Sequence, residues 1–263
     1  MDVLNRTDLT ALPHYLDAWN PKALPPDARR FLSARVAPPL CAALEEAGFA
    51  PRVGFDLETL AEFRHNLADP RWTKLAEPCD PHLNPGATEN DTFVVYMLNP
   101  AGEVWGCAAS RLRWLEGSLA DNLAHQTALA ERPDRLPEGQ RFASLGAMAG
   151  DIRDVPVAWG SSLWAHDKAP RMLVPAIMRM LHLWTVAHWA WSYTVSIGQP
   201  RIADRYGFDV HGYDLVARGA RRTNPEGATT DYRLMIAGRA RIRALVTDPG
   251  YTDLTRDLSG LGM

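Results

Sequence analysis

The amino-acid sequence predicts an α+β fold built on a mixed β-sheet, with an N-terminal extension and an insertion after the third strand. Three observations support this prediction. Segments rich in β-forming residues alternate with helical segments, two of the strand-like segments are joined by a tight turn, and a long apolar helix separates two others. Strands on both sides of a crossover helix imply that parallel and antiparallel neighbours share one sheet.

Residues 1–48 form the N-terminal extension. They read as a proline-rich arm followed by a short helix that ends at Gly48, a favourable residue after a helix C-terminus. The core domain is expected over residues 49–240. It opens with a short edge strand, after which Asp56 is placed to cap a helix through Leu67, because apolar residues recur there at helical spacing.

A β-hairpin is the clearest element of the core. The segment TFVVYML at 92–98 is rich in β-forming residues, and the sequence Asn-Pro-Ala-Gly at 99–102 suits a turn. A second strand follows over 104–114. We therefore expect an antiparallel hairpin centred on this turn.

Residues 115–156 interrupt the strand pattern. This segment is polar, contains proline and glycine, is partly helical around 122–130, and reads as an insertion over one face of the sheet. A strand is expected over 157–165. A loop then leads into the apolar helix, whose first turn tolerates Pro175.

The rest of the chain completes the sheet. A strand is expected over 193–197, a short helix over 200–206, two strands near 213–217 and 231–236, and a tail over 241–263. The sheet thus has about six or seven strands, and the two strands that flank the apolar helix run parallel across a right-handed crossover.

Composition and charge limit the function classes. The net charge of −3 gives no bulk reason to expect a nucleic acid or an anionic membrane as partner. Cys41, Cys79 and Cys107 are widely spaced and form no CxxC pair, which suits a reducing compartment. No signal peptide is visible at the N-terminus, so a cytoplasmic location is expected.

The apolar stretch 172–191 has the length of a membrane span. It contains Arg179, His182 and His188, and no second such segment follows, so a buried core helix is expected. The two histidines do not share a helix face, as metal ligands at i and i+4 do. No metal site is predicted.

Three segments resemble, in order, parts of the GNAT superfamily of N-acetyltransferases over residues 50–237. VVYMLNPAGEVWGCAASRLRW is similar to the second and third strands of that family. VAWGSSLWAHDKAPRMLVPAIMRM is similar in placement to the strand, loop and helix that hold the cofactor pyrophosphate, and IGQPRIADRYGFDVHGYDL to the fifth strand, fourth helix and next strand. The resemblance implies an N-acyltransferase that moves an acyl group from acyl-CoA, or from the phosphopantetheine of an acyl carrier protein, to an amine of a small molecule.

The resemblance also implies where the thioester binds. The pantetheine chain lies between the fourth and fifth strands, and the pyrophosphate lies at the start of the apolar helix, where unpaired N–H groups and the helix dipole favour an anion. Two cationic side chains add charge there, although a solvated basic turn is the alternative. The cofactor-binding candidates are Trp164, Ala165, Lys168, Arg171, Met172, Leu173 and Ser196.

Three residues are the catalytic candidates. Tyr206 is a candidate proton donor to the leaving thiolate, with ring packing as its alternative. His166 is a candidate acceptor of the amine proton, with a loop hydrogen bond as its alternative. Ser161 and Ser162 lie in a strand whose alternation directs only one of them to the cleft, and Ser161 is the candidate. A backbone N–H near Ala165 is expected to polarise the thioester carbonyl.

The chain departs from the family pattern at several places. Residues 170–175 contain no glycine where the family loop has glycines, and Ala203 stands at the family's tyrosine position. Ser196 stands where asparagine is frequent, and no glutamate lies over 157–165. These departures favour a rival interpretation, a non-catalytic GNAT-like binding or scaffold domain. A third interpretation is a structural protein whose N-terminal arm mediates a homodimer.

One branch of the family carries a similar insertion. Acyl-homoserine-lactone synthases and N-acyl amino acid synthases have a long insertion after the third strand, and the segment GCAASRLRW with its following insertion is similar to them. At the place of the E-x-S-R pattern of those enzymes, this chain has Trp-Gly-Ser-Ser-Leu at 159–163, without the glutamate and the arginine. Several tryptophans are expected in the core, with an apolar cavity for a longer acyl chain as the alternative: Trp159, Trp164, Trp184, Trp189 and Trp191.

Overall fold

The computed structural model describes residues 8–21, 23–69, 73–144, 148–207, 211–224 and 226–256. The strands are β1 (Ala50–Gly54), β2 (Thr92–Leu98), β3 (Val104–Trp114), β4 (Arg141–Ser144), β5 (Pro156–Ala165), β6 (Tyr193–Gly198), β7 (Leu215–Thr223) and β8 (Thr229–Gly238). The helices are α1 (Pro26–Arg35), α2 (Ala37–Glu46), α3 (Leu57–His65), α4 (Leu119–Ala124), α5 (Met148–Asp151), α6 (Leu173–His188), α7 (Pro200–Tyr206) and α8 (Arg239–Thr247).

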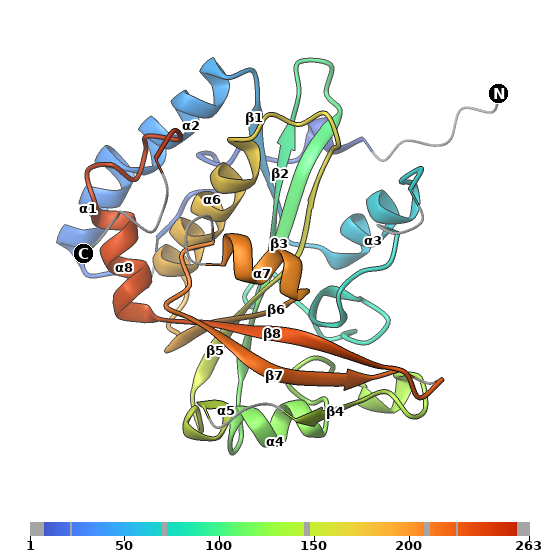
Figure 1. Cartoon of the computed structure of the whole chain (residues 1–263). Helices are drawn as coiled ribbons and strands as arrows, with labels where there is room; N and C mark the ends of the chain where they lie inside the picture. The colour runs from blue at the N-terminus through green and yellow to red at the C-terminus, as the bar shows by residue number, and fades with distance from the viewer. Residues whose placement is uncertain are drawn as a thin grey trace.

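These strands form one sheet in the order β1-β2-β3-β5-β6-β8-β7-β4 (Figure 1). β5 and β6 are parallel, and the other neighbouring pairs are antiparallel. α6 connects the parallel pair, since parallel neighbours need a long crossover. The predicted mixed α+β sheet and its parallel pair are confirmed.

The β2–β3 hairpin forms where the sequence predicts it. Asn99 N–H donates to the Glu103 carbonyl at 2.8 Å, and Gly102 N–H donates to the Asn99 carbonyl at 2.9 Å. Gly102 has a φ of 76°, a left-handed conformation that favours glycine. Asp56 also caps α3 as predicted, because its carboxylate accepts two N–H groups of the first turn.

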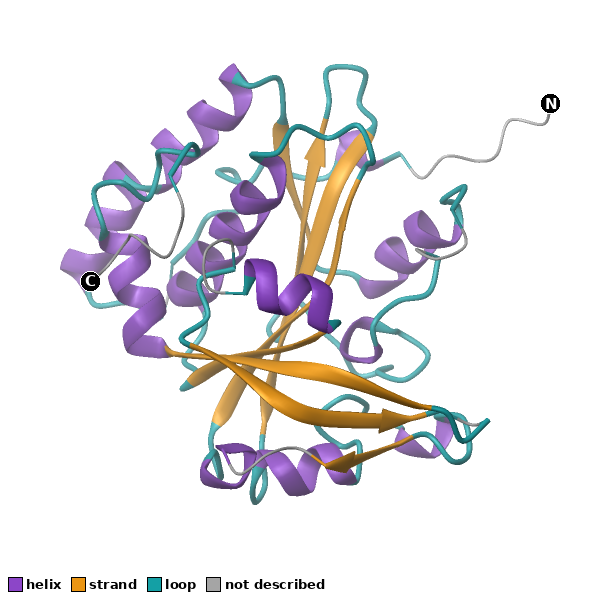
Figure 2. Cartoon of the chain, in the orientation of Figure 1, coloured by secondary structure: helices purple, strands orange, loops and turns teal. Residues whose placement is uncertain are grey.

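α1, α2, α6 and α8 cover one face of the sheet (Figure 2). α6 packs closely on β3 at Gly106. A Cβ atom built on this glycine would lie only 2.5 Å from Ile177 Cδ1, so the contact leaves no room for a side chain. The N-terminal extension packs on α6 as well: the buried Tyr15 hydroxyl donates to the Met180 carbonyl at 2.9 Å. The extension and α8 therefore share a core with the sheet, and the division at residues 48 and 240 stays a prediction.

α3 and the insertion cover the opposite face (Figure 1). Leu119 and Leu123 of α4 pack with Trp159 of β5 and Ile236 of β8 in one buried cluster. The predicted placement of the insertion over one face is confirmed, and the insertion helix begins a few residues earlier than expected.

Five elements differ from the sequence prediction in the following ways. α1 forms within the predicted arm. Pro26 occupies the first turn of this helix, where a proline starts a helix rather than breaking it. β4 lies within the insertion and pairs with β7, so the described sheet has eight strands rather than six or seven. Four residues are too few to show a periodic pattern. α8 begins two residues before the predicted tail and continues into it, and β7 and β8 are longer than expected.

α6 is a buried helix of 16 residues, as predicted for the apolar stretch. Within the described ranges, no helix has both the length and the hydropathy that crossing a bilayer requires.

Candidate functional site

β5 and β6, the fourth and fifth strands of the sequence prediction, form a fork. They pair over three residues each, of which Trp159 and Val195 are the last. Beyond this pair the strands part, although β5 continues to Ala165 and β6 to Gly198. Among the described residues, the edge of β5 that faces β6 therefore has no strand partner over its second half. This is the pair of strands between which the pantetheine chain is expected from the sequence.

A cavity of about 500 Å³ lies in and beside the fork. Met178 and Leu181 of α6 line it on one side of the sheet, and Leu129 and Phe142 of the insertion line it on the other. Polar and charged side chains also line it: Arg64, Glu77, Ser161, Ser196, His211 and Tyr213.

Tyr213 lies at the point where the strands part. A Cβ atom built on Gly160 would lie 3.1 Å from the Tyr213 hydroxyl oxygen. Burial raises the pKa of the Tyr213 phenol to about 12, and hydrogen bonds with the side chains of Ser196 and Thr194 oppose that rise. The phenol therefore keeps its proton at neutral pH and lies beside both strands of the fork.

Ser161 contributes a hydroxyl to the cavity, 2.8 Å from the Cys79 Sγ. Cys79 is fully buried, and burial raises the pKa of its thiol to about 11, although hydrogen bonds and the nearby Arg111 lower it in part. A thiol with this pKa is protonated near neutral pH and is a poor nucleophile. Cys79 is therefore no candidate for covalent catalysis.

Arg64 of α3 lies beneath the fork and is only 3% exposed. Its Nη1 donates to the Ser162 carbonyl at 3.1 Å and its Nη2 to the Lys74 carbonyl at 3.5 Å. Ser162 has a φ of 55°, a left-handed conformation that is uncommon for serine. Through these two hydrogen bonds, Arg64 connects α3 to the segment before Cys79 and to β5 at Ser162, where the strand is irregular.

The insertion side of the cavity carries an ion pair. Arg222 of β7 pairs with Glu77, and both side chains are less than one-fifth exposed. The Arg222 guanidinium lies 5.9 Å from the centre of the Phe142 ring. The insertion side of the cavity therefore presents the paired charges of Arg222 and Glu77 beside the ring of Phe142.

Two histidines lie at and behind the α6 side of the cavity. His211 lines the cavity, and burial lowers its pKa to about 4. His182 of α6 is fully buried: burial lowers its pKa to about 3, and the nearby positive or titratable groups of His211, Arg179 and Arg241 lower it further. Both imidazoles are uncharged at neutral pH and are weak bases.

The start of α6 offers few N–H groups for an anion. Leu173 N–H donates to the Pro170 carbonyl at 2.9 Å, and Pro175 has no N–H. Lys168 and Arg171 are exposed on the loop before the helix. An anion at this position would therefore be held mainly by these two side chains.

His166 lies outside the cavity lining, at the end of β5. Its ring stacks on Trp105 with the ring centres 5.1 Å apart. Its Nδ1 accepts the Lys168 N–H at 3.1 Å and lies 2.9 Å from a carboxylate oxygen of Asp167. The imidazole is thus engaged within its own loop. Trp164 is buried on the α3 side of the sheet.

The structure brings part of the predicted site together. Ser161 and Ser196 line the cavity. Tyr206, the last residue of α7, is half-buried and lies outside the lining, and Phe208 lies outside the described residues. The other predicted residues lie together at the end of β5 and the start of α6: Trp164, Ala165, His166, Lys168, Arg171, Met172 and Leu173.

Sequence reasoning missed three residues of the site: Arg64, His211 and Tyr213. Each is brought to the fork by contacts between elements far apart in the sequence, and no local pattern marks them. The one available signal is that Tyr213 begins the strand expected near 213–217; in the structure it lies two residues before β7.

No group of three or more His, Cys, Asp and Glu side chains in the described part of the chain is arranged to hold a metal ion. Cys41, Cys79 and Cys107 are free thiols, all buried.

No protein-family model and no curated protein matches the sequence. Among solved structures, the chain is similar to FeeM, an N-acyl amino acid synthase from uncultured soil microbes, with a TM-score of 0.35 and 11% identity, covering 83% of this chain and 89% of that chain. It is also similar to AAC(6')-Ib in complex with ribostamycin and coenzyme A, with a TM-score of 0.36 and 12% identity, covering 74% and 95% of the two chains. At these TM-scores the likenesses by themselves assign neither a reaction nor a substrate.

Proposed function

We propose that the protein is an N-acyltransferase of the GNAT type, which moves an acyl group from a pantetheine thioester to an amine of a small molecule. The observation that supports this function is the open fork between the parallel strands β5 and β6. Beyond Trp159, no strand in the described part of the chain pairs with the edge of β5 facing β6, so an extended chain with amide groups finds N–H and C=O partners there. The cavity volume suits a small-molecule site.

The chemistry needs no covalent intermediate on the protein. The amine nitrogen attacks the thioester carbonyl carbon, the C–N bond forms, and the C–S bond then breaks. The departing thiolate gains one proton and the nitrogen loses one, so charge and atoms balance. Cys79 stays a protonated thiol beside Ser161 and takes no part in the transfer.

Tyr213 is the proposed donor of the proton to the leaving sulfur. Its phenol is protonated, buried, and placed where the two strands part. The phenolate regains its proton from the amine nitrogen through water. Tyr206 lies outside the cavity lining, whereas Ser161 lines it and is proposed to orient the amine.

The acyl donor is acyl-CoA or the acylated phosphopantetheine of a carrier protein. Lys168 and Arg171 would contact the CoA pyrophosphate at the start of α6. The engaged Leu173 N–H and the proline at 175 weaken that phosphate site, a feature that favours a donor whose pyrophosphate is absent.

The same feature favours a second candidate function, a non-catalytic domain that binds a pantetheine or another small molecule in the fork. Mass spectrometry separates the two. Purified protein is incubated with acetyl-, octanoyl- or decanoyl-CoA, or with the matching acyl-pantetheines, and a panel of small amines. Release of free thiol together with an N-acyl product supports the transferase. Saturable thioester binding without product for any amine favours the binding domain, and absence of both contradicts the proposed function.

A further inference from the structure

β5 carries a bulge inside the fork. In its register with β3, Ser161 lies opposite Ala109 and Trp164 lies opposite Cys107, so the described register pairs neither Ser162 nor Leu163 with a residue of β3. Ser162 occupies the left-handed region at a φ of 55°, which a serine keeps only when neighbouring groups hold it there.

Arg64 contacts this bulge from α3. Its Nη1 donates to the Ser162 carbonyl at 3.1 Å, and both residues are buried, at 3% and 8% exposure. The Cys107 thiol lies 4.0 Å from the same carbonyl oxygen. Because Arg64 belongs to α3 and Cys107 faces the α3 side of the sheet, the carbonyl points into the α3 layer.

The direction of this carbonyl fixes the direction of an N–H group. All described peptide bonds are trans. In a trans peptide the C=O and the following N–H point in opposite directions, so the Leu163 N–H points away from Arg64 and the α3 layer. Ser162 and Leu163 both line the cavity, which places this peptide at the surface of the fork.

We propose that Arg64 is a positioning residue: by binding the Ser162 carbonyl, it turns the Leu163 N–H into the fork, where that N–H donates to the thioester carbonyl oxygen. This inference rests on the proposed transferase function and adds the source of carbonyl polarisation. A donor fixed in advance stabilises the negative charge that develops on the oxygen as the amine attacks. The N–H group that polarises the thioester carbonyl is then that of Leu163 in the bulge, and not one near Ala165 as expected from the sequence.

The test compares Arg64→Met and Arg64→Lys with wild type and with Arg239→Met. Arg239 is a matched control, because its Nη1 donates to the Trp191 carbonyl at 3.1 Å and it does not line the cavity. Isotope-edited infrared spectroscopy measures the carbonyl band of bound acyl-CoA labelled with carbon-13 at the thioester. Calorimetry measures the dissociation constant, and thiol release measures kcat.

Wild type and R239M should shift the band of the bound thioester to lower frequency. R64M should lose most of that shift and lower kcat by about 10- to 100-fold, with a dissociation constant close to wild type. R64K should restore part of both and covers the case in which R64M does not fold. An unchanged band and kcat in R64M, or in R64K should R64M not fold, overturn the role of Arg64 while leaving the transferase intact. Wild type that neither binds nor turns over thioesters overturns the proposed function as well.

Discussion

The hydroxyl oxygen of Tyr213 lies over Gly160 at the point where β5 and β6 part, so close that a Cβ atom on Gly160 would be 3.1 Å from it. Ser196 and Thr194 of β6, on the other strand, lower the pKa of the same hydroxyl through their side chains, against the rise that burial causes. A larger residue in place of Gly160 on β5 would require the tyrosine to shift. This pair places a protonated acid beside the edge along which the thioester is proposed to lie.

Replacing Tyr213 by phenylalanine should remove the proton donor without filling the fork. We expect kcat for acyl-CoA to fall by about 100-fold, the lower end for general acid catalysis, with little change in thioester binding. An aryl thioester, whose thiolate leaves without a proton, should be turned over by the Phe variant at nearly the wild-type rate. Steady-state kinetics with both donors checks this.

Tyr206→Phe is the control, because Tyr206 lies outside the cavity lining. Equal losses on both donors in Y213F would indicate a structural role for Tyr213. A loss confined to Y206F would return the acid role to the residue predicted from the sequence.

The double substitution Lys168→Ala with Arg171→Ala tests the phosphate site at the start of α6. Both side chains are exposed, so acyl-CoA binding should weaken by only roughly twofold to fivefold. The difference should shrink as salt is added, because exposed charges are screened. Binding of acyl-pantetheine, which lacks the pyrophosphate, should not change.

Calorimetric titration of both ligands checks this prediction, with Arg30→Ala plus Arg35→Ala on α1 as the control for lost positive charge. An identical loss for acyl-CoA and acyl-pantetheine would show that the two cations do not act on phosphate.

The stability of the protein should fall as the pH is lowered below about 6.5, the unperturbed histidine pKa. His182 and His211 have pKa values lowered to about 3 and about 4 by burial, so the unfolded chain binds protons on them that the folded chain does not. The resulting loss of stability develops as the pH falls from 6.5 towards those values and is absent at higher pH.

His182→Met should make this pH dependence shallower, because one of the two titrating groups is removed. Urea unfolding from pH 8 to pH 4 measures the effect. His65→Asn, on the exposed end of α3, should leave the slope unchanged. An H182M profile parallel to that of wild type would contradict the prediction.

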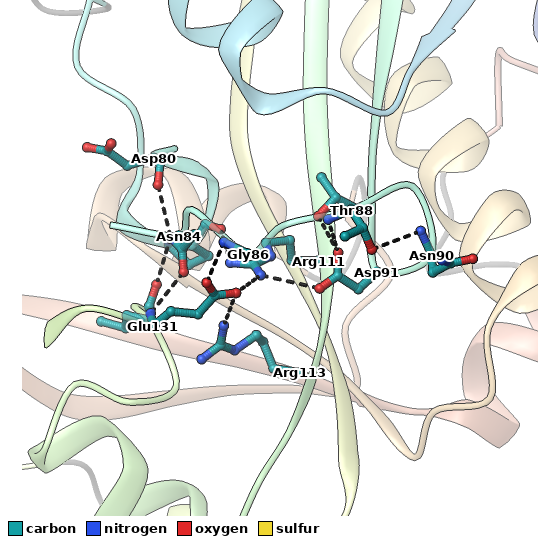
Figure 3. Close-up of polar contacts among 12 residues, drawn as sticks. Asp80, Asn84, Gly86, Thr88, Asn90, Asp91, Arg111, Arg113 and Glu131 are labelled. Carbon is teal, nitrogen blue, oxygen red and sulfur yellow. Dashed lines mark hydrogen bonds and ion pairs between the residues drawn. The ribbon is translucent and has the colours of Figure 1, made fainter. Parts of the chain in front are cut away.

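Glu131 anchors the insertion to the sheet (Figure 3). Its carboxylate accepts from Arg111 at 2.6 Å, from Arg113 at 3.3 Å and from the Gly86 N–H at 2.7 Å. Arg111 is fully buried, and its second carboxylate partner, Asp91, is 3.3 Å away. Glu131→Ala should therefore cost roughly 2 kcal/mol of unfolding free energy, since it leaves a buried guanidinium with one carboxylate partner fewer.

Asp134→Ala is the matched control for Glu131→Ala. Asp134 pairs with Arg132 at 2.7 Å on the surface of the same insertion, and its removal should leave the stability unchanged. Chemical denaturation of both variants gives the comparison. Equal stability of E131A and D134A would mean that the Arg111 network does not hold the insertion.

Much of the fold could be predicted from the sequence, because its central elements follow local rules. The turn at 99–102 and the cap at Asp56 are chemical signals, and the strands beside them have strong β-forming composition. α1 and β4 escaped prediction for different reasons. The prolines that suggest an irregular arm also start helices, and β4 exists only because β7 provides an edge to pair with.

The site was less predictable than the fold. The resemblance and the alternation of β5 led to Ser161 and Ser196, which line the cavity. Tyr213 and Arg64 act at the fork through contacts across long stretches of sequence, and no spacing rule joins Arg64 to the Ser162 carbonyl. A bulge with a left-handed serine also cannot be seen in a strand whose composition is ordinary.

Amide hydrogen exchange with and without a saturating acyl-CoA or acyl-pantetheine tests the central claim, that the thioester lies along the open edge of β5. The exchange of residues 160–165 of β5 and 196–198 of β6 should slow on binding, while that of β2, outside the fork, should not change. Protection confined to other segments, measured under conditions where calorimetry shows the thioester bound, would contradict the placement of the site in the fork.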